Sequence, residues 1–190
     1  MAVTKKLGIV YDSNKCVGCQ ACALACKAQN NVPDGVSRLQ VHVEIKGKFP
    51  KPRMDFHRQS CVMCEDAPCV SVCPTKASYT NEQGVNLINQ NKCIGCKYCI
   101  VACPYQARFA NPVTGAADKC TFCWETLTSK GQKPACVTSC PTGALSFGDV
   151  NDPNSEFSAV VAKTHVIKPK AHLRTHQKVV TIPNWRGGME

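Results

Sequence analysis

Residues 92–104 read KCIGCKYCIVACP, and this stretch decides the fold. Its cysteines are Cys93, Cys96, Cys99 and Cys103. Three cysteines at three-residue intervals, with a fourth four positions further on, are typical of the ligands of a [4Fe–4S] cluster. Gly95 lets the backbone approach such a cluster closely or take a positive φ. In proteins with two clusters the fourth cysteine binds the other cluster, so this motif predicts a partner motif.

The chain supplies three more motifs of this kind. The first motif, KCVGCQACALACK, holds Cys16, Cys19, Cys22 and Cys26. The second motif, SCVMCEDAPCVSVCP, holds Cys61, Cys64, Cys69 and Cys73. Residues 92–104 form the third motif, and the fourth holds Cys120, Cys123, Cys136 and Cys140. Four motifs of four account for all sixteen cysteines, so four [4Fe–4S] clusters are the simplest prediction.

The order of the motifs predicts how they pair. The second and third motifs are adjacent, within residues 61–110, and can form a unit by themselves, whereas the first and fourth can pair only across that unit. The expected fold class is α+β, with two pseudo-symmetric halves like bacterial ferredoxins, one inserted in the other, rich in clusters and built of short strands and helices. Residues 5–30 and 115–150 then form the outer half of one intertwined unit, 1–190. Residues 151–190 are expected to be a C-terminal wrap or docking arm.

Cross-ligation within each half gives the expected ligand sets. Group a is Cys16, Cys19, Cys22 and Cys140. Group b is Cys26, Cys120, Cys123 and Cys136. Group c is Cys61, Cys64, Cys69 and Cys103. Group d is Cys73, Cys93, Cys96 and Cys99.

A disulfide scaffold and structural zinc are the alternatives to cluster binding. An even number of cysteines can indicate disulfides, but disulfide-rich modules are usually short and secreted. Paired CxxC units can indicate zinc, which takes four ligands. A third cysteine within seven residues then has no role in a zinc site, whereas a [4Fe–4S] cluster uses it. Clusters therefore explain the spacing better than either alternative.

The charge of the protein fits cluster binding rather than nucleic-acid binding. The formal net charge is +10 with every cysteine counted as neutral. An oxidised [4Fe–4S] cluster with four thiolates carries about −2, so four of them leave the protein at about +2. We therefore expect no nucleic-acid partner. The lysines next to cysteines are expected to neutralise the clusters or tune their potentials, and they are Lys15, Lys92, Lys97 and Lys119.

The remaining sequence predicts short elements and no active site. We expect a strand over residues 5–12, a hairpin of residues 40–50 with 53–58, a helix near 154–163 and a last strand within 176–185. No nucleophile, base and oxyanion-hole constellation is visible, so no catalytic residue is expected.

The histidines predict no metal site. His172 and His176 are spaced i and i+4, but they have no third ligand and are expected to be a solvated pair. No constellation is apparent around His42, His57 or His165.

The sequence contains no visible signal peptide and no apolar run near the roughly 18 residues that span a membrane. By itself the protein is therefore expected to be soluble, with no transmembrane segment of its own. It is expected to reach a membrane or the periplasm only with a partner.

The motifs resemble the iron–sulfur electron-transfer subunits of molybdopterin oxidoreductases, the polysulfide, thiosulfate and dimethyl sulfoxide reductase type. The resemblance rests on phrases such as KCVGCQACALACKAQNNVP, CEDAPCVSVCPTKASY and PACVTSCPTGALSFGD and covers roughly residues 5–150. It implies a subunit that is no enzyme on its own and relays electrons between a molybdopterin catalytic subunit, near group a, and a membrane quinone subunit, near group d.

The resemblance also implies a location. The protein is expected to be peripheral on the membrane, on the periplasmic face, exported as passenger of the catalytic subunit; the alternative is the cytoplasm. The alternative function is a polyferredoxin-type carrier that serves a haem nitrite or sulfite reductase, a hydrogenase or a formate dehydrogenase.

Overall fold

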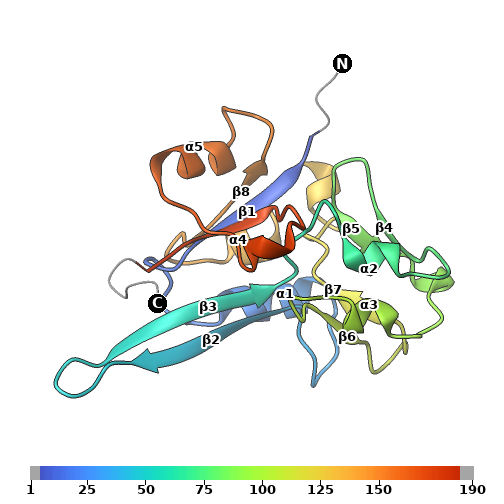
Figure 1. Ribbon diagram of the computed structural model, residues 1–190, viewed down its shortest axis with the longest axis horizontal. Coiled ribbons are helices and arrows are strands. Elements are labelled where there is room, and N and C mark those ends of the chain that lie inside the picture. Colours follow the sequence, from blue (N-terminus) through green and yellow to red (C-terminus); the bar gives the residue numbers. More distant parts are fainter. Residues whose placement is uncertain (1–4, 185–190) are drawn as a thin grey trace.

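The structure is a computed structural model that describes residues 5–184, and its fold is α+β with few helices and short strands (Figure 1). The strands are β1 (Leu7–Asp12), β2 (Leu39–Lys46), β3 (Arg53–Ser60), β4 (Ser78–Thr80), β5 (Asn86–Ile88), β6 (Arg108–Ala110), β7 (Ala117–Lys119), β8 (Leu145–Asp149) and β9 (Val179–Ile182). The α-helices are α1 (Ala21–Gln29), α2 (Pro68–Ser71), α3 (Tyr98–Val101), α4 (Ala135–Thr138) and α5 (Glu156–Lys163). The 3₁₀ turns are η1 (Gln90–Lys92), η2 (Thr128–Lys130) and η3 (Ala171–Leu173).

One three-stranded sheet joins the beginning and the end of the described residues. Its strand order is β8-β1-β9. The middle strand β1 pairs antiparallel with β8 and parallel with β9, with Ile9 opposite Phe147 and Val10 opposite Val180. Because β1 leads into the first motif and β8 follows the fourth, this sheet ties those two motifs together. The predicted first and last strands are confirmed, although residue 185 of the last prediction lies outside the described residues.

A long hairpin, β2–β3, extends from the body of the molecule (Figure 1). The prediction of a hairpin here is confirmed, with Val41 opposite Arg58 and Lys46 opposite Arg53. Its base is fixed next to the first motif: the Gln20 side-chain amide donates to the Val41 carbonyl at 2.8 Å. The Tyr11 hydroxyl donates to the carbonyl of Phe56 at 2.7 Å.

The helices that carry the third cysteine of each motif pack in two pairs, α1 with α4 and α2 with α3. Helices α2, α3 and α4 have four residues each, whereas α1 has nine. Proline restricts the backbone before it and cannot continue a helix. Pro74, Pro104 and Pro141 follow the fourth cysteine of three motifs, and Lys27 stands at that position in the first. Helix α1 therefore continues through Cys26 for another turn.

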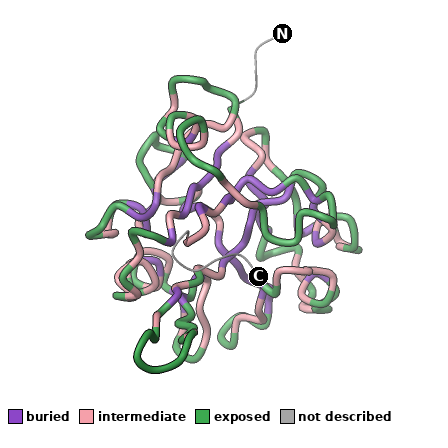
Figure 2. The backbone as a smooth tube through the Cα atoms, turned by 60° about the vertical axis from the view of Figure 1, so that its left-hand side comes forward, coloured by how far each residue is buried: buried purple, intermediate pink, exposed green. Residues whose placement is uncertain are grey.

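The core contains cysteines as well as apolar side chains, and Figure 2 shows the buried segments converging inside the molecule. Cysteines from all four motifs belong to one buried cluster together with Ile9, Leu39 and Val85. A smaller cluster lies under α5, around Phe157 and Val180. A metal cluster bound by these cysteines therefore lies inside the core. For this reason we expect metal binding and folding to be coupled.

Candidate metal centres

All sixteen cysteines lie within the described residues and are free thiols, which argues against the disulfide alternative. The structure brings the cysteines of group a together around one cavity, where Cys140 from the fourth motif faces three cysteines of the first. A second cavity is lined by all four cysteines of group d, with Cys73 from the second motif facing three of the third. The predicted pairing of motifs one with four and two with three is thus present in the geometry of these two cavities.

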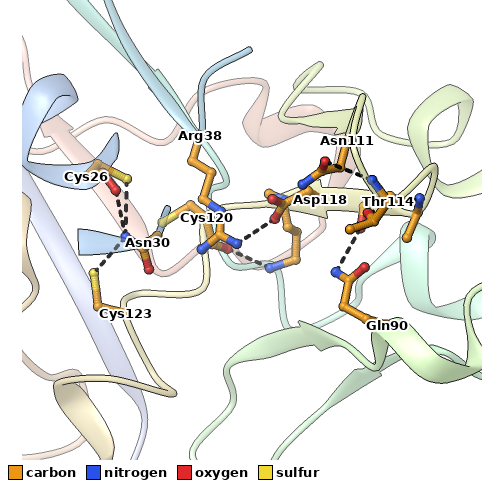
Figure 3. Close-up of polar contacts among 12 residues, drawn as sticks. Cys26, Asn30, Arg38, Gln90, Asn111, Thr114, Asp118, Cys120 and Cys123 are labelled. Atoms are coloured by element: carbon orange, nitrogen blue, oxygen red, sulfur yellow. Dashed lines mark hydrogen bonds and ion pairs between the residues drawn. The ribbon is translucent and has the colours of Figure 1, made fainter. Parts of the chain in front are cut away.

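Group b is buried, and an asparagine bridges two of its cysteines. The Asn30 side-chain amide lies 3.7 Å from Cys26 Sγ and 3.5 Å from Cys123 Sγ, so it donates toward sulfurs of the first and fourth motifs (Figure 3). Burial raises the pKa of Cys26, and the neighbouring thiols of group b raise it further. Burial likewise raises the pKa of Cys136 to about 12. Thiolates in this group therefore need a positively charged partner, which the irons of a cluster supply.

Group c shows the same effect of burial. Burial raises the pKa of Cys64 to about 11, and the nearby Cys61, Cys69 and Cys103 add to the rise. A hydrogen bond with Thr175 opposes it. Cys64 interacts electrostatically with the other three thiols of group c. The four thiols therefore lie close together, as the ligands of one metal cluster must.

Cys73 and Cys140 lie in matching turns that donate hydrogen bonds to sulfur. Ser78 N lies 3.4 Å from Cys73 Sγ, and Ala144 N lies 3.3 Å from Cys140 Sγ. Burial opposes a fall in the pKa of both thiols, but backbone N–H and threonine hydroxyl donors lower it overall. Hydrogen bonds of this kind stabilise a thiolate ligand and raise cluster potentials.

The residue before the second cysteine of each motif has a left-handed backbone. The φ values are 68° at Gly18, 50° at Met63, 69° at Gly95 and 54° at Phe122. A Cβ on Gly18 would lie 2.3 Å from the Phe56 ring, so glycine is required there. The sequence indicates this conformation at Gly95 and gives no signal for it at Met63 or Phe122. Met63 and Phe122 adopt it because their side chains are almost completely buried, 0% and 1% exposed, and packing offsets the strain.

Two buried cations lie near the cysteines, one at a position that the motifs indicated and one at a position that they did not. Of the four lysines next to cysteines, Lys119 is buried, with 0% exposure, whereas Lys15, Lys92 and Lys97 are exposed. Arg108, which the sequence analysis did not single out, donates from Nη2 to Cys69 Sγ at 2.9 Å. Its signal in the sequence is weak, since an isolated arginine in a short strand has no distinctive spacing.

The histidines differ in part from expectation. His172 and His176 are both exposed, as predicted, and His176 pairs with Asp66 at 2.6 Å. The expectation that His57 has no constellation is wrong, because the ligand atoms of His57, Glu44 and Asp55 lie within 4.8 Å of one another. The strand register of the hairpin, invisible in the sequence, brings them together.

The His57 cluster is nevertheless neutralised by the protein itself. Lys46 Nζ lies 3.2 Å from a Glu44 oxygen and 3.6 Å from an Asp55 oxygen. Arg53 Nε is also 3.6 Å from Asp55. These cations compete with any metal, so we assign no metal to the hairpin.

Two matches to family models together cover all four motifs. A model described as a 4Fe-4S dicluster domain matches residues 52–150, and a second with the same description matches residues 15–77. Together with sixteen cysteines they account for four [4Fe–4S] clusters, and four groups of free, converging thiols fit that number. Among residues 5–184, no helix has both the length and the apolar character needed to cross a membrane.

Several curated proteins are similar over most of their length. A polysulfide reductase subunit of Wolinella succinogenes is 54% identical over 190 residues, which is 99% of the present sequence and 100% of that protein. Protein NrfC of Escherichia coli (strain K12) is 47% identical over 180 residues, 94% of the present sequence and 81% of that protein. The thiosulfate reductase electron transfer subunit PhsB of Salmonella typhi is 46% identical over 168 residues, 87% of the present sequence and 86% of that protein.

Proposed function

Since the protein belongs to the 4Fe–4S dicluster family, we propose that it is the electron-transfer subunit of a multi-subunit reductase. It relays electrons between a membrane quinone subunit and a molybdopterin catalytic subunit of the polysulfide or thiosulfate type. Groups a, b, c and d each hold one cluster, and a [4Fe–4S] cluster, when bound, takes up or gives up one electron at a time. The protein contributes ligands, spacing, shielding from water and charge, and no substrate chemistry of its own.

The observation that carries this proposal is the gradient of exposure across the four groups. Group a contains the exposed Cys19, and group d contains the exposed Cys96. Every cysteine of group b is buried, and group c is buried apart from the half-buried Cys103. Two open ends and a shielded middle are what a relay between two partners requires, because electrons enter and leave only at the ends.

The middle of the relay is continuous between the two halves. The Cys120 thiol of group b lies close enough to Cys61 of group c for their charges to interact. Groups a and b share the first and fourth motifs, and groups c and d share the second and third. The order a, b, c, d follows from these three junctions.

Exposed apolar side chains flank both ends and support partner surfaces there. Val17 and Leu24 lie next to group a, with 58% and 67% of their surface exposed. The corresponding exposed residues at group d are Ile94, Tyr98 and Val101. We assign the group a end to the catalytic subunit and the group d end to the quinone subunit. The complex is peripheral on the membrane, on its periplasmic face, with this subunit exported as passenger of its partner.

The same proposal describes the protein as two ferredoxin-like halves, one inserted in the other. Residues 61–110 form the inner half, and residues 5–30 with 115–150 form the outer half. The two helix pairs, α1 with α4 and α2 with α3, support an approximate twofold relation. The pairing of β9 with β1 supports residues 151–184 as a wrap around the outer half.

The test is the ratio of molybdenum to iron in the tagged protein, purified anaerobically from native membranes with its partners. We expect molybdenum together with abundant iron, near sixteen irons per molecule of this subunit if all four groups are filled, as four [4Fe–4S] clusters require. Iron without molybdenum would contradict the assignment to a molybdopterin complex.

The second candidate is a polyferredoxin-type carrier for a haem nitrite or sulfite reductase, a hydrogenase or a formate dehydrogenase. The observation that favours it is the 47% identity to Protein NrfC, whose name specifies no molybdopterin partner. Haem absorption in the purified complex, in place of molybdenum, would support a haem reductase as the partner, and nickel would support a hydrogenase.

A further inference from the structure

Arg108 lies between group c and group d. Its side chain is 5% exposed. Nη2 donates to Cys69 Sγ of group c at 2.9 Å and to Ser78 Oγ at 2.7 Å, and the same side chain lines the cavity of group d. Nε and Nη1 are buried and have no hydrogen-bond partner within the described part of the protein. The guanidinium therefore faces two cysteine groups with donors still available.

Arg58 holds the corresponding position between group a and group b. It belongs to β3, and its side chain lines the cavity of group a. Its Nε and Nη2 are buried and likewise lack a hydrogen-bond partner among residues 5–184. The Arg58 charge also acts on Cys22 of group a and on Cys120 and Cys136 of group b. The field of one arginine thus reaches both groups of the outer half.

Lys119 lies between group b and group c, where the two halves meet. It is 0% exposed, and its ammonium donates to the carbonyl of Cys120 at 2.7 Å and to the carbonyl of Asn86. Asn86 in turn donates to the carbonyl of Cys64 at 2.9 Å. One lysine therefore connects the backbone of a group b ligand to that of a group c ligand.

None of these three cations forms an ion pair with a carboxylate within the described residues. Arg38 provides the contrast: it also lies near Cys26, but Asp118 neutralises it at 2.8 Å (Figure 3). A buried charge is costly unless an opposite charge lies nearby. The thiolates and the clusters that they hold are the anions that remain to compensate Arg58, Lys119 and Arg108.

We propose that Arg58, Lys119 and Arg108 are positioning residues, each of which raises the reduction potentials of the two clusters on either side of it. One-electron reduction adds one negative charge to a cluster, and a fixed cation in a shielded interior stabilises that state. Because each cation is shared, it links the potentials of neighbours along the relay. This inference rests on the proposed function, specifically on one cluster in each of groups a to d.

The test is a redox titration of the purified holo-complex, with dithionite and mediators, followed by electron paramagnetic resonance. The variants are Arg58→Gln, Lys119→Met and Arg108→Gln. Each should lower two of the four midpoint potentials, with about a tenfold change in the ratio of reduced to oxidised cluster, or about 59 mV for one electron. Arg58→Gln should shift the potentials of the clusters in groups a and b, and Arg108→Gln should shift those of the clusters in groups c and d. Lys119→Met should shift the potentials of the clusters in groups b and c.

Lys97→Gln is the matched control. Lys97 is exposed beside Cys96, and the corresponding residue of the first motif is already glutamine, Gln20, with the same left-handed backbone (φ 64° and 62°). Solvent screens its charge, so its removal should change the reduced-to-oxidised ratio less than about twofold. Arg108→Lys keeps a cation and should shift the potentials much less than Arg108→Gln.

Three results would overturn the inference. The first is variants that retain four clusters with unshifted potentials, and the second is a uniform shift of all four clusters. The third is loss of iron in Arg108→Gln and Arg108→Lys alike, together with unshifted potentials in the Arg58 and Lys119 variants. Failure of the proposed function would look different, since the unmodified complex would then lack molybdenum or show fewer than four cluster transitions before any substitution is made.

Discussion

The end groups, a and d, and the middle groups, b and c, each consist of four cysteines but differ in how far those cysteines are exposed. At the ends one cysteine of each group is exposed, and the cysteine that crosses from the other motif has its pKa lowered by hydrogen-bond donors. In the middle, burial raises the pKa of Cys26, Cys64 and Cys136. The comparison shows that the spacing of the cysteines determines which metal group a site can hold. Burial and nearby charge determine how readily its thiols become thiolates.

The largest expected effect is that of removing iron from all four groups. The middle groups are part of the core, so chelation under mild oxidation should abolish cooperative thermal unfolding rather than merely lower the transition temperature. Near-ultraviolet circular dichroism and calorimetry, before and after iron removal, measure this. Retention of a sharp unfolding transition in the iron-free protein would show that the core does not depend on the clusters.

Single-ligand variants compare the middle with an end directly. Cys120→Ser in group b should lower both the iron content and the unfolding temperature, because a buried ligand is lost. Cys96→Ser in group d should leave the unfolding temperature nearly unchanged. Both should slow quinol-linked turnover, on the order of 10–100-fold, the size of effect typical when a metal site is perturbed. Equal unfolding temperatures in the two variants would show that ligands in the middle groups and in the end groups contribute equally to stability.

Asn30→Ala tests the hydrogen bonds to the sulfurs of group b. Loss of the amide donor to Cys26 and Cys123 should lower the potential of one cluster and destabilise the protein by about 1–3 kcal/mol. Redox titration and thermal unfolding measure the two effects. Gln29→Ala, at the last residue of α1, is the control and should change neither the potential nor the stability. If Gln29→Ala changed both as much as Asn30→Ala does, the effect would come from a change in the helix and not from the hydrogen bonds to sulfur.

Glu65→Gln should have the smallest effect, because its charge is exposed beside group c. Glu65 pairs with Lys6 at 2.8 Å, and this hydrogen bond lowers the pKa of Glu65. A lowered carboxyl pKa contributes stability above the unfolded value, and that stability is lost as the pH falls through the folded value. The substitution should therefore cost less than about 1 kcal/mol at neutral pH and nothing in acid. A pH series of unfolding temperatures for both proteins checks this, and a large, pH-independent loss would contradict it.

The sequence was sufficient to predict the α+β class and the pairing of the cysteines that line the two cavities, from the cysteine spacing, and the hairpin, from the strand pattern of residues 40–58. Those features depend on local geometry and on a repeated ligand pattern. Three other features depend on tertiary packing and leave no local signal. Met63 takes a left-handed backbone without being glycine, Arg108 reaches Cys69 from a distant strand, and His57 meets Glu44 through hairpin register. A single arginine among many cations cannot be recognised until the fold shows that it is buried.

The pairing of β1 with β9, and of α1 with α4, also affects the time course of assembly. Cysteines of the first motif leave the ribosome first, yet Cys22 and Cys26 must wait for partners near the other end of the motif-bearing segment. The second and third motifs find each other over a much shorter loop, which is entropically cheaper to close. Groups c and d should therefore be ready for cluster insertion while synthesis continues, and groups a and b should be completed last, once Cys140 has been synthesised.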